Sequence, residues 1–133
     1  MKKATALFAV VLTCVLTSCA QFGVQPSPRA GNVEHVVLIW LNEPGNAAHK
    51  EQMIAAARAF PQEIPGILAM SIGDAVPSER EVVDDSFDLA FVMRFKDKAA
   101  LDAYEKHPVH VKAVKEVLAP HVSKLKVYDV AVR

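Results

Sequence analysis

The stretch at residues 87–95, FDLAFVMRF, alternates apolar side chains with mixed ones over its whole length. Because successive side chains of a β-strand point to opposite faces of the sheet, this period of two predicts a strand with one fully apolar face. The other face is apolar only in its middle, at Ala90 and Val92. Such a strand needs a hydrophobic layer on one side, so the rest of the chain has to provide one.

Three further strands and the helices that cover them follow from the same reading of periodicity. The predicted elements are, in order, a strand at 33–41 (VEHVVLIWL), a helix at 47–63, a strand at 67–72, the strand at 87–95, helices at 98–106 and 109–118, and a strand at 124–132. This order is that of the ferredoxin-like split βαβ arrangement. We therefore predict an α+β domain, βαββαβ, in which a four-stranded antiparallel sheet carries its helices on one face.

The helix-free face of this sheet is also expected to be apolar. In the strand at 33–41, Val36, Leu38 and Trp40 alternate with Val37, Ile39 and Leu41, so both faces receive apolar side chains. A bare sheet face of this kind would expose a larger patch than monomers usually tolerate. We therefore predict a homodimer in which two sheets pack face to face as a dimeric α/β barrel.

The N-terminus has the pattern of a bacterial lipoprotein signal. A positive start, Met1–Lys3, precedes an apolar run at residues 4–16 that is shorter than the ~20 residues needed to span a bilayer. The sequence LTSC at residues 16–19 resembles the lipobox, whose cysteine is lipidated and becomes the mature N-terminus. We expect residues 1–18 to be a signal peptide and Cys19 to carry acyl chains such as palmitate. A signal cleaved elsewhere and an uncleaved anchor are the alternatives.

The signal predicts a lipid-anchored protein of the cell envelope. Ala20, rather than an aspartate, follows the cysteine, which favours the outer membrane facing the periplasm in a Gram-negative cell. Residues 19–32 hold the lipidated cysteine and a stretch that mixes Pro, Gly, Ser and Gln without apolar periodicity, which is typical of a flexible tether. The folded domain is expected at residues 33–133.

Charge excludes one class of partner. The chain has 15 Lys and Arg against 15 Asp and Glu, and loss of Lys2 and Lys3 with the signal leaves the remainder slightly acidic. There is no basic field to hold nucleic acid. Because Cys14 would leave with the signal and Cys19 would be acylated, we expect no disulfide and no cysteine metal ligand in the domain.

The stretch AYEKHPVHV at residues 103–111 places one phenol and two imidazoles around a proline. Pro108 suits the first position of a helix, and His107, as the residue before proline, is disfavoured in helical geometry. A neutral imidazole at His110 can accept a proton, and the phenol of Tyr104 can donate a hydrogen bond to a developing enolate. The pair suits proton abstraction beside a carbonyl. Core packing of Tyr104 and helix capping by His107 form the alternative, structural interpretation.

A metal site at His107 and His110, with His35 as a third ligand, is another interpretation of these histidines. Neutral imidazoles bind zinc, copper or nickel. The intervening proline, however, turns the two rings away from a common helical face, and no carboxylate stands nearby with ligand spacing. We therefore predict neither a metal nor another cofactor. His49 and His121 show no partner pattern and are expected at the surface.

From residue 33 to residue 132, the chain resembles the stress-responsive dimeric α/β-barrel (Dabb) family. The resemblance is carried by the opening strand VEHVVLIWL with its histidine, by the junction DAYEKHPVHV and by the closing strand KLKVYDV. A plant cyclase of this family carries out an aldol condensation without a cofactor. Its catalytic tyrosine and histidine match Tyr104 and His110, and its other pocket histidines match His35 and His107.

The resemblance and the residues together lead to one main hypothesis about function. We expect a membrane-anchored lipoprotein that binds a small, partly apolar molecule, with Tyr104, His110, His35 and His107 as its polar contacts. For an enzyme, the resemblance implies cofactor-independent proton transfer or aldol-type chemistry, with His110 as base and Tyr104 as hydrogen-bond donor. The alternative is a non-enzymatic, stress-associated structural or interaction lipoprotein. A haem- or quinone-type monooxygenase rests on fold analogy alone.

Overall fold

The computed structural model describes residues 26–133 of the chain. The predicted signal peptide at residues 1–18 and the predicted acylation of Cys19 lie outside the described residues. The elements are β1 (Val33–Leu41), α1 (Ala47–Arg58), α2 (Phe60–Glu63), β2 (Ile67–Gly73), β3 (Leu89–Phe95), α3 (Lys98–Lys106), α4 (Pro108–Ala113), the π-helical turn η1 (Val114–Leu118) and β4 (Val122–Ala131). Within residues 26–133, no helix combines the length and the apolar composition needed to cross a bilayer.

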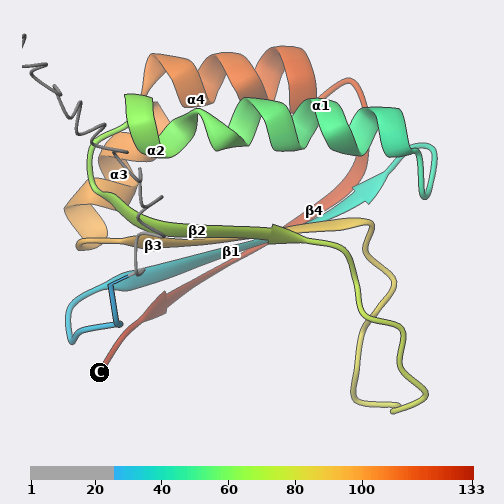
Figure 1. Cartoon of the computed structure of the whole chain (residues 1–133), viewed down its shortest axis with the longest axis horizontal. Helices are drawn as coiled ribbons and strands as arrows, with labels where there is room; N and C mark the ends of the chain where they lie inside the picture. The colour runs from blue at the N-terminus through green and yellow to red at the C-terminus, as the bar shows by residue number, and fades with distance from the viewer. Residues whose placement is uncertain (1–25) are drawn as a thin grey trace, which may run out of the picture.

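The strands form one antiparallel sheet in the order β2-β3-β1-β4. The two strands with the longest apolar alternation, β1 and β3, are its central pair. The helices lie together over one face of the sheet, and the long β2–β3 connection extends on the other side (Figure 1). The predicted ferredoxin-like α+β fold is therefore confirmed.

The core lies between the helices and the sheet, where the alternation of the strands places it. In β1, every second residue from Val33 to Leu41 is buried, and the residues between them are half-buried. In β3, Leu89 and Phe95 are completely buried. Helix α3 closes the core with Leu101 and Tyr104. This layer is the hydrophobic partner that the alternating strand at residues 87–95 requires.

The helix predicted at residues 47–63, with fraying expected at Pro61, is divided into α1 and α2 just before that proline. Pro61 has no N–H to donate to Ala57, and its ring would collide with the carbonyl group of that residue in a continuous helix. The chain changes course at Ala59, whose N–H bonds to the carbonyl oxygen of Ala56 at 3.4 Å. The break directs the ring of Phe60 into the core.

The strand predicted from residue 87 begins at Leu89 instead. The carboxylate of Asp88 accepts hydrogen bonds from the backbone N–H groups of Leu41 and Gly45, at 2.8 and 2.6 Å. These contacts bind Asp88 to the end of β1. Phe87 then packs edge-on against Trp40 on the helix-free side, with 6.3 Å between ring centroids. The alternation predicted that Phe87 would extend the buried face of the strand, and this prediction is wrong.

The helix predicted at residues 109–118 consists of two parts with different hydrogen bonding. After α4 the chain widens into the π-helical turn η1, where the N–H of Ala119 bonds to the carbonyl oxygen of Val114 at 2.8 Å. Such turns are rare and often occur at functional sites. Here the widened turn directs Val114, Val117 and Leu118 towards the space between helices and sheet.

The helix-free face of the sheet, called the open face below, remains partly apolar. Register places Val36, Val92 and Tyr128 side by side on this face. The exposed fractions of Val92, Tyr128 and Val130 are 38%, 50% and 53%. The open face therefore has the apolar character that led us to expect a partner subunit.

Residues 26–32, which we predicted to be part of a flexible tether, are hydrogen-bonded to the domain. Asn32 is buried, and its side chain donates to the carbonyl oxygen of Lys96 at 2.9 Å. Within residues 26–133, hydrogen bonds to the sheet therefore extend back to Pro26, before the domain start predicted at Val33.

Candidate functional site

A cavity lies between the helical layer and the sheet. The space open to the centres of water molecules is about 60 Å³, several times the ~10–15 Å³ that a single water needs. The apolar walls include Val37, Phe91 and Met93 from the sheet and Met53, Phe60 and Val117 from the helical side. The lining also includes three predicted site residues with polar side chains, His35, Tyr104 and His110. The cavity is therefore an apolar space with a small polar group of side chains.

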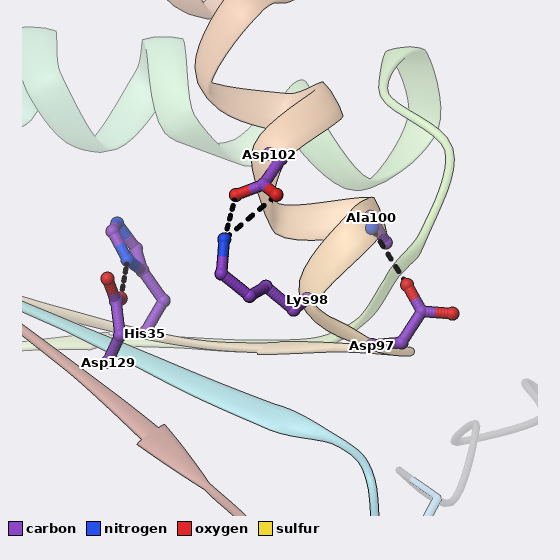
Figure 2. Close-up of polar contacts among 6 residues, drawn as sticks. All are labelled: His35, Asp97, Lys98, Ala100, Asp102 and Asp129. Atoms are coloured by element: carbon purple, nitrogen blue, oxygen red, sulfur yellow. Dashed lines mark hydrogen bonds and ion pairs between the residues drawn. The ribbon is translucent and has the colours of Figure 1, made fainter.

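Tyr104 reaches this cavity because α3 is amphipathic and well capped. The side chain of Asp97 caps α3 by accepting from the N–H of Ala100 at 2.8 Å, and Lys98 pairs with Asp102 one turn later at 2.6 Å (Figure 2). Tyr104 lies on the buried face of α3. The centroid of its ring is 4.9 Å from that of Phe95.

The phenol of Tyr104 stays protonated at neutral pH. Burial, and secondarily the nearby carboxylate of Glu105, raise its pKa far above the usual range. Its hydroxyl group has no hydrogen-bond partner among residues 26–133, although it belongs to a residue that lines the cavity. A neutral phenol of this kind can donate a hydrogen bond to a bound molecule.

His110 lies beside Tyr104, with 4.2 Å between the ring centroids. Its Nδ1 is 3.1 Å from the backbone carbonyl oxygen of Glu105. A carbonyl oxygen can only accept, so Nδ1 carries the hydrogen and the neutral ring keeps an unprotonated Nε2. Burial lowers the pKa of His110 below its ordinary value, and the neighbouring His35 lowers it further. The neutral ring that a general base requires is therefore favoured near pH 7.

His35 brings a carboxylate partner that the sequence reasoning missed. Its Nδ1 donates to Oδ1 of Asp129 at 2.6 Å, across the β1–β4 pair (Figure 2). His35 is 5% exposed, and its ring contacts that of Tyr104 edge-on at 5.9 Å. The carboxylate fixes the tautomer and orientation of this imidazole. Asp129 is the one acidic residue within the otherwise apolar end of the last strand, YDVAV, and that position is the signal that could have identified it.

His107 lies at the junction but does not line the cavity. Its Nδ1 accepts from the N–H of Val109 at 3.3 Å and so caps α4. The structure thus brings together His35, Tyr104 and His110 of the four predicted contacts, and it gives His107 the capping role that was the structural alternative. We correct its assignment from ligand contact to helix cap.

The arrangement of the histidines also bears on the metal interpretation. Among residues 26–133, no three or more His, Cys, Asp or Glu side chains converge as a metal site would require. His49 and His121, expected as isolated surface residues, instead stack on each other with 3.8 Å between ring centroids. Both residues are half-buried, and they lie outside the cavity lining.

The side chains that the structure brings together are suited to proton transfer. One end of the apolar cavity holds a neutral imidazole with a free Nε2, a protonated phenol, and a second imidazole held by a carboxylate. A bound carbonyl compound could give a proton to the first group while its oxygen accepts a hydrogen bond from the second. This chemistry needs no group other than these side chains.

Comparison with known proteins places the chain in a family. Residues 33–132 match the profile of the Stress responsive A/B Barrel Domain, Dabb. The protein belongs to the Dabb family. This match includes the whole sheet, the cavity side chains His35, Tyr104 and His110, and the partner of His35, Asp129, so the family resemblance noted in the sequence is confirmed. No functionally curated protein matches the chain.

Solved structures of other proteins have a similar fold. A Dabb protein with a ferredoxin-like fold from Mesorhizobium loti has 22% identity and a TM-score of 0.64, with 77% of this chain and 98% of that chain covered. A dimeric ferredoxin-like protein of unknown function from Jannaschia has 27% identity and a TM-score of 0.64, with 77% and 100% covered. A hydroxynitrile lyase from Passiflora edulis has 19% identity and a TM-score of 0.68, with 79% and 96% covered.

Proposed function

We propose that this Dabb protein is a lipid-anchored, homodimeric envelope protein that binds a small, largely apolar molecule between its helices and its sheet. The observation that carries the proposal is the polar group in the apolar cavity, in which Nε2 of His110 and the hydroxyl of Tyr104 have no partner among residues 26–133. Small-molecule sites commonly combine apolar walls with a few polar groups that fix orientation. The cavity has both parts.

The proposed reaction is cofactor-independent proton transfer, which forms an enolate and is the first step of aldol-type chemistry. Nε2 of His110 takes a proton from the carbon next to the carbonyl group of the substrate. The electron pair of that C–H bond moves towards the carbonyl oxygen, and the resulting enolate oxygen accepts a hydrogen bond from Tyr104. His35, oriented by Asp129, supports the same oxygen or a second polar group. The proposal is supported by the existence of an enzyme with a similar fold, the hydroxynitrile lyase from Passiflora edulis.

The lipid anchor is proposed on the sequence at residues 16–19. Metabolic labelling with palmitate should label the wild-type protein, and Cys19→Ser should lose the label. Cys14→Ser is the matched control, because residue 14 lies within the predicted signal, and it should keep the label. Unlabelled wild-type protein would reject the anchor and leave the cavity proposal unaffected.

Binding is tested by native mass spectrometry of protein purified from its own cells. We expect the wild-type dimer to retain a small organic compound, and a Tyr104→Phe/His110→Gln variant to lose it. The chain has two tyrosines, and Tyr128→Phe on the open face is the control that should keep the compound. If both variants retain it equally, or if the wild type retains nothing, a non-enzymatic interaction lipoprotein becomes the better interpretation.

Proton abstraction is tested separately, with acetophenone as a simple ketone in deuterated water. The wild type should speed deuterium incorporation into the methyl group of the ketone. His110→Gln should abolish the increase, whereas His121→Gln, outside the cavity lining, should preserve it. Exchange at the background rate would restrict the proposal to binding.

A further inference from the structure

The residues just before β1 are fastened to one end of the sheet, which we call the tether end. The guanidinium of Arg94 donates to the carbonyl oxygen of Pro26 at 2.5 Å. The side chain of Asn32 donates to the carbonyl oxygen of Lys96 at 2.9 Å. Backbone bonds also join Gly31 and Asn32 to Val132, at 3.1 and 2.9 Å. The start of β1 and the C-terminal residues therefore meet at this end, as Figure 1 shows for the two chain segments.

These bonds limit how far the domain can move from an acylated Cys19. Seven residue steps separate Cys19 from Pro26, and a chain of that length spans at most roughly 25 Å even when fully extended. Strand β1 alone has 9 residues, and at ~3.3 Å per residue its length of roughly 30 Å exceeds that whole span. The opposite end of the sheet, where α1 begins, could reach the bilayer only with this connection stretched back along the domain.

The charges at the tether end suit an anionic surface. Arg29 and Lys96 are exposed, and neither forms an ion pair with another residue of the described chain. Glu34 is paired with Arg94 at 2.6 Å, and Asp129 is paired with His35 at 2.6 Å. The carboxylate of Asp97 keeps its charge but accepts a hydrogen bond as the cap of α3. Arg133 adds a cation but also the terminal carboxylate. Exposed cations close to an anionic bilayer are attracted to its surface, and that attraction weakens with salt.

We propose that the tether end rests on an anionic phospholipid surface and that the end where α1 begins faces away from it. This orientation rests on the proposed acylation of Cys19. Its consequence for the site is that His35, the third residue of β1, and its partner Asp129, near the end of β4, lie in the half of the domain next to the bilayer. An apolar ligand that partitions into lipid would then be concentrated beside the polar end of the cavity.

The experiment uses the full-length lipidated protein in vesicles of phosphatidylethanolamine and phosphatidylglycerol. Two exposed alanines in the first turns of helices are replaced by cysteine and labelled with a fluorophore: Ala99 in α3 near the tether end, and Ala48 in α1 at the opposite end. A short-range nitroxide quencher is attached to the lipid headgroups. We expect strong quenching at Ala99→Cys and little at Ala48→Cys.

Two further variants separate the causes of this difference. The first variant combines an insertion of twenty Gly and Ser residues before Pro26 with Arg29→Glu and Lys96→Glu. The insertion lengthens the connection by roughly 25 Å in root-mean-square terms. In this variant the two labels should be equally quenched. Lys112→Glu and Lys115→Glu, on the helical layer, are the matched charge controls and should preserve the difference. Equal quenching in the wild type would overturn the orientation while leaving the anchor intact. Protein that fails to float with the vesicles would overturn both proposals.

Discussion

At the scale of single residues, the site depends on polar atoms that the fold leaves available. The ring of Tyr104 is part of the core, but its hydroxyl group bonds to no other described residue. His110 uses one ring nitrogen for the backbone of Glu105 and keeps the other free. Because these atoms do little for the fold, substitutions there should separate stability from binding.

The first prediction concerns Tyr104→Phe. Because no hydrogen bond of the described chain is lost, the free energy of unfolding should change by no more than about 1 kcal/mol. The affinity for the compound retained by the native protein should fall about 5- to 10-fold, as expected for the loss of one hydrogen bond. Urea denaturation and titration of that compound measure the two effects. A large loss of stability with unchanged affinity would show that the hydroxyl group is structural.

The second prediction concerns the pH dependence of His110. Its pKa in the folded state is lower than the ordinary value of 6.5, first because of burial and then because of His35. Between the folded pKa and 6.5, the unfolded chain therefore binds more protons than the folded one, and this residue makes stability rise with pH.

NMR titration of the His110 imidazole should give a midpoint below 6.5. In urea denaturation, the wild type should lose stability as the pH falls through this window, and His110→Gln should lose less. Identical pH profiles of the two proteins would contradict the assignment of this imidazole as a buried neutral ring.

At the scale of secondary-structure elements, the breaks within the helices shape the cavity, and strand periodicity could not predict these breaks. Pro61 divides the predicted first helix, and a π-helical turn replaces the end of the predicted last one. Both deviations shape the cavity, since Phe60 and Val117 line it. Hydrophobic periodicity could predict that helices cover the sheet, but it could not predict a widened turn, because that depends on packing against neighbouring elements.

One close approach between elements leads to a third prediction, Gly66→Ala. Gly66 has φ of 95°, and a Cβ atom there would lie 2.7 Å from Cβ of Ala100 in α3. The left-handed conformation and the collision together should cost about 2 kcal/mol or more in the free energy of unfolding. Thermal and urea denaturation measure the loss. Gly73→Ala is the control, because a Cβ atom there meets nothing within 4 Å, and it should be nearly neutral.

At the scale of the whole molecule, the fold has a covered face and an open one. The open face carries exposed Val92, Tyr128 and Val130 in the single chain. A second copy that packs sheet against sheet would remove these side chains from water, and the related protein from Jannaschia is dimeric. The homodimer is therefore part of the proposed function.

The fourth prediction compares two exposed valines. Val92→Lys places a charge in the middle of the proposed sheet-to-sheet interface and should convert the dimer into a monomer. Val111→Lys, on α4 and 49% exposed, should leave the dimer intact. Light scattering coupled to size exclusion gives the mass of each variant. Monomeric wild-type protein at micromolar concentration would rule out the interface.

The sequence predicted the topology well and the site only in part, for a physical reason. Strand alternation and element order depend on local periodicity, and they gave the ferredoxin-like fold. Tyr104 and His110 are close in the chain and could be paired from their spacing across Pro108. The partner of His35 is 94 positions away and is set by the register between β1 and β4, which local patterns do not encode.

The distance along the chain between His35 and Asp129 has a consequence for when the site can exist. One residue lies near the beginning of the domain and the other in its last strand, so a partly synthesised chain cannot contain the pair. Any chemistry that depends on an oriented His35 is withheld until the final residues have joined the edge of the sheet. Loss of only the last few residues by proteolysis would switch it off again without removing any residue of the cavity wall.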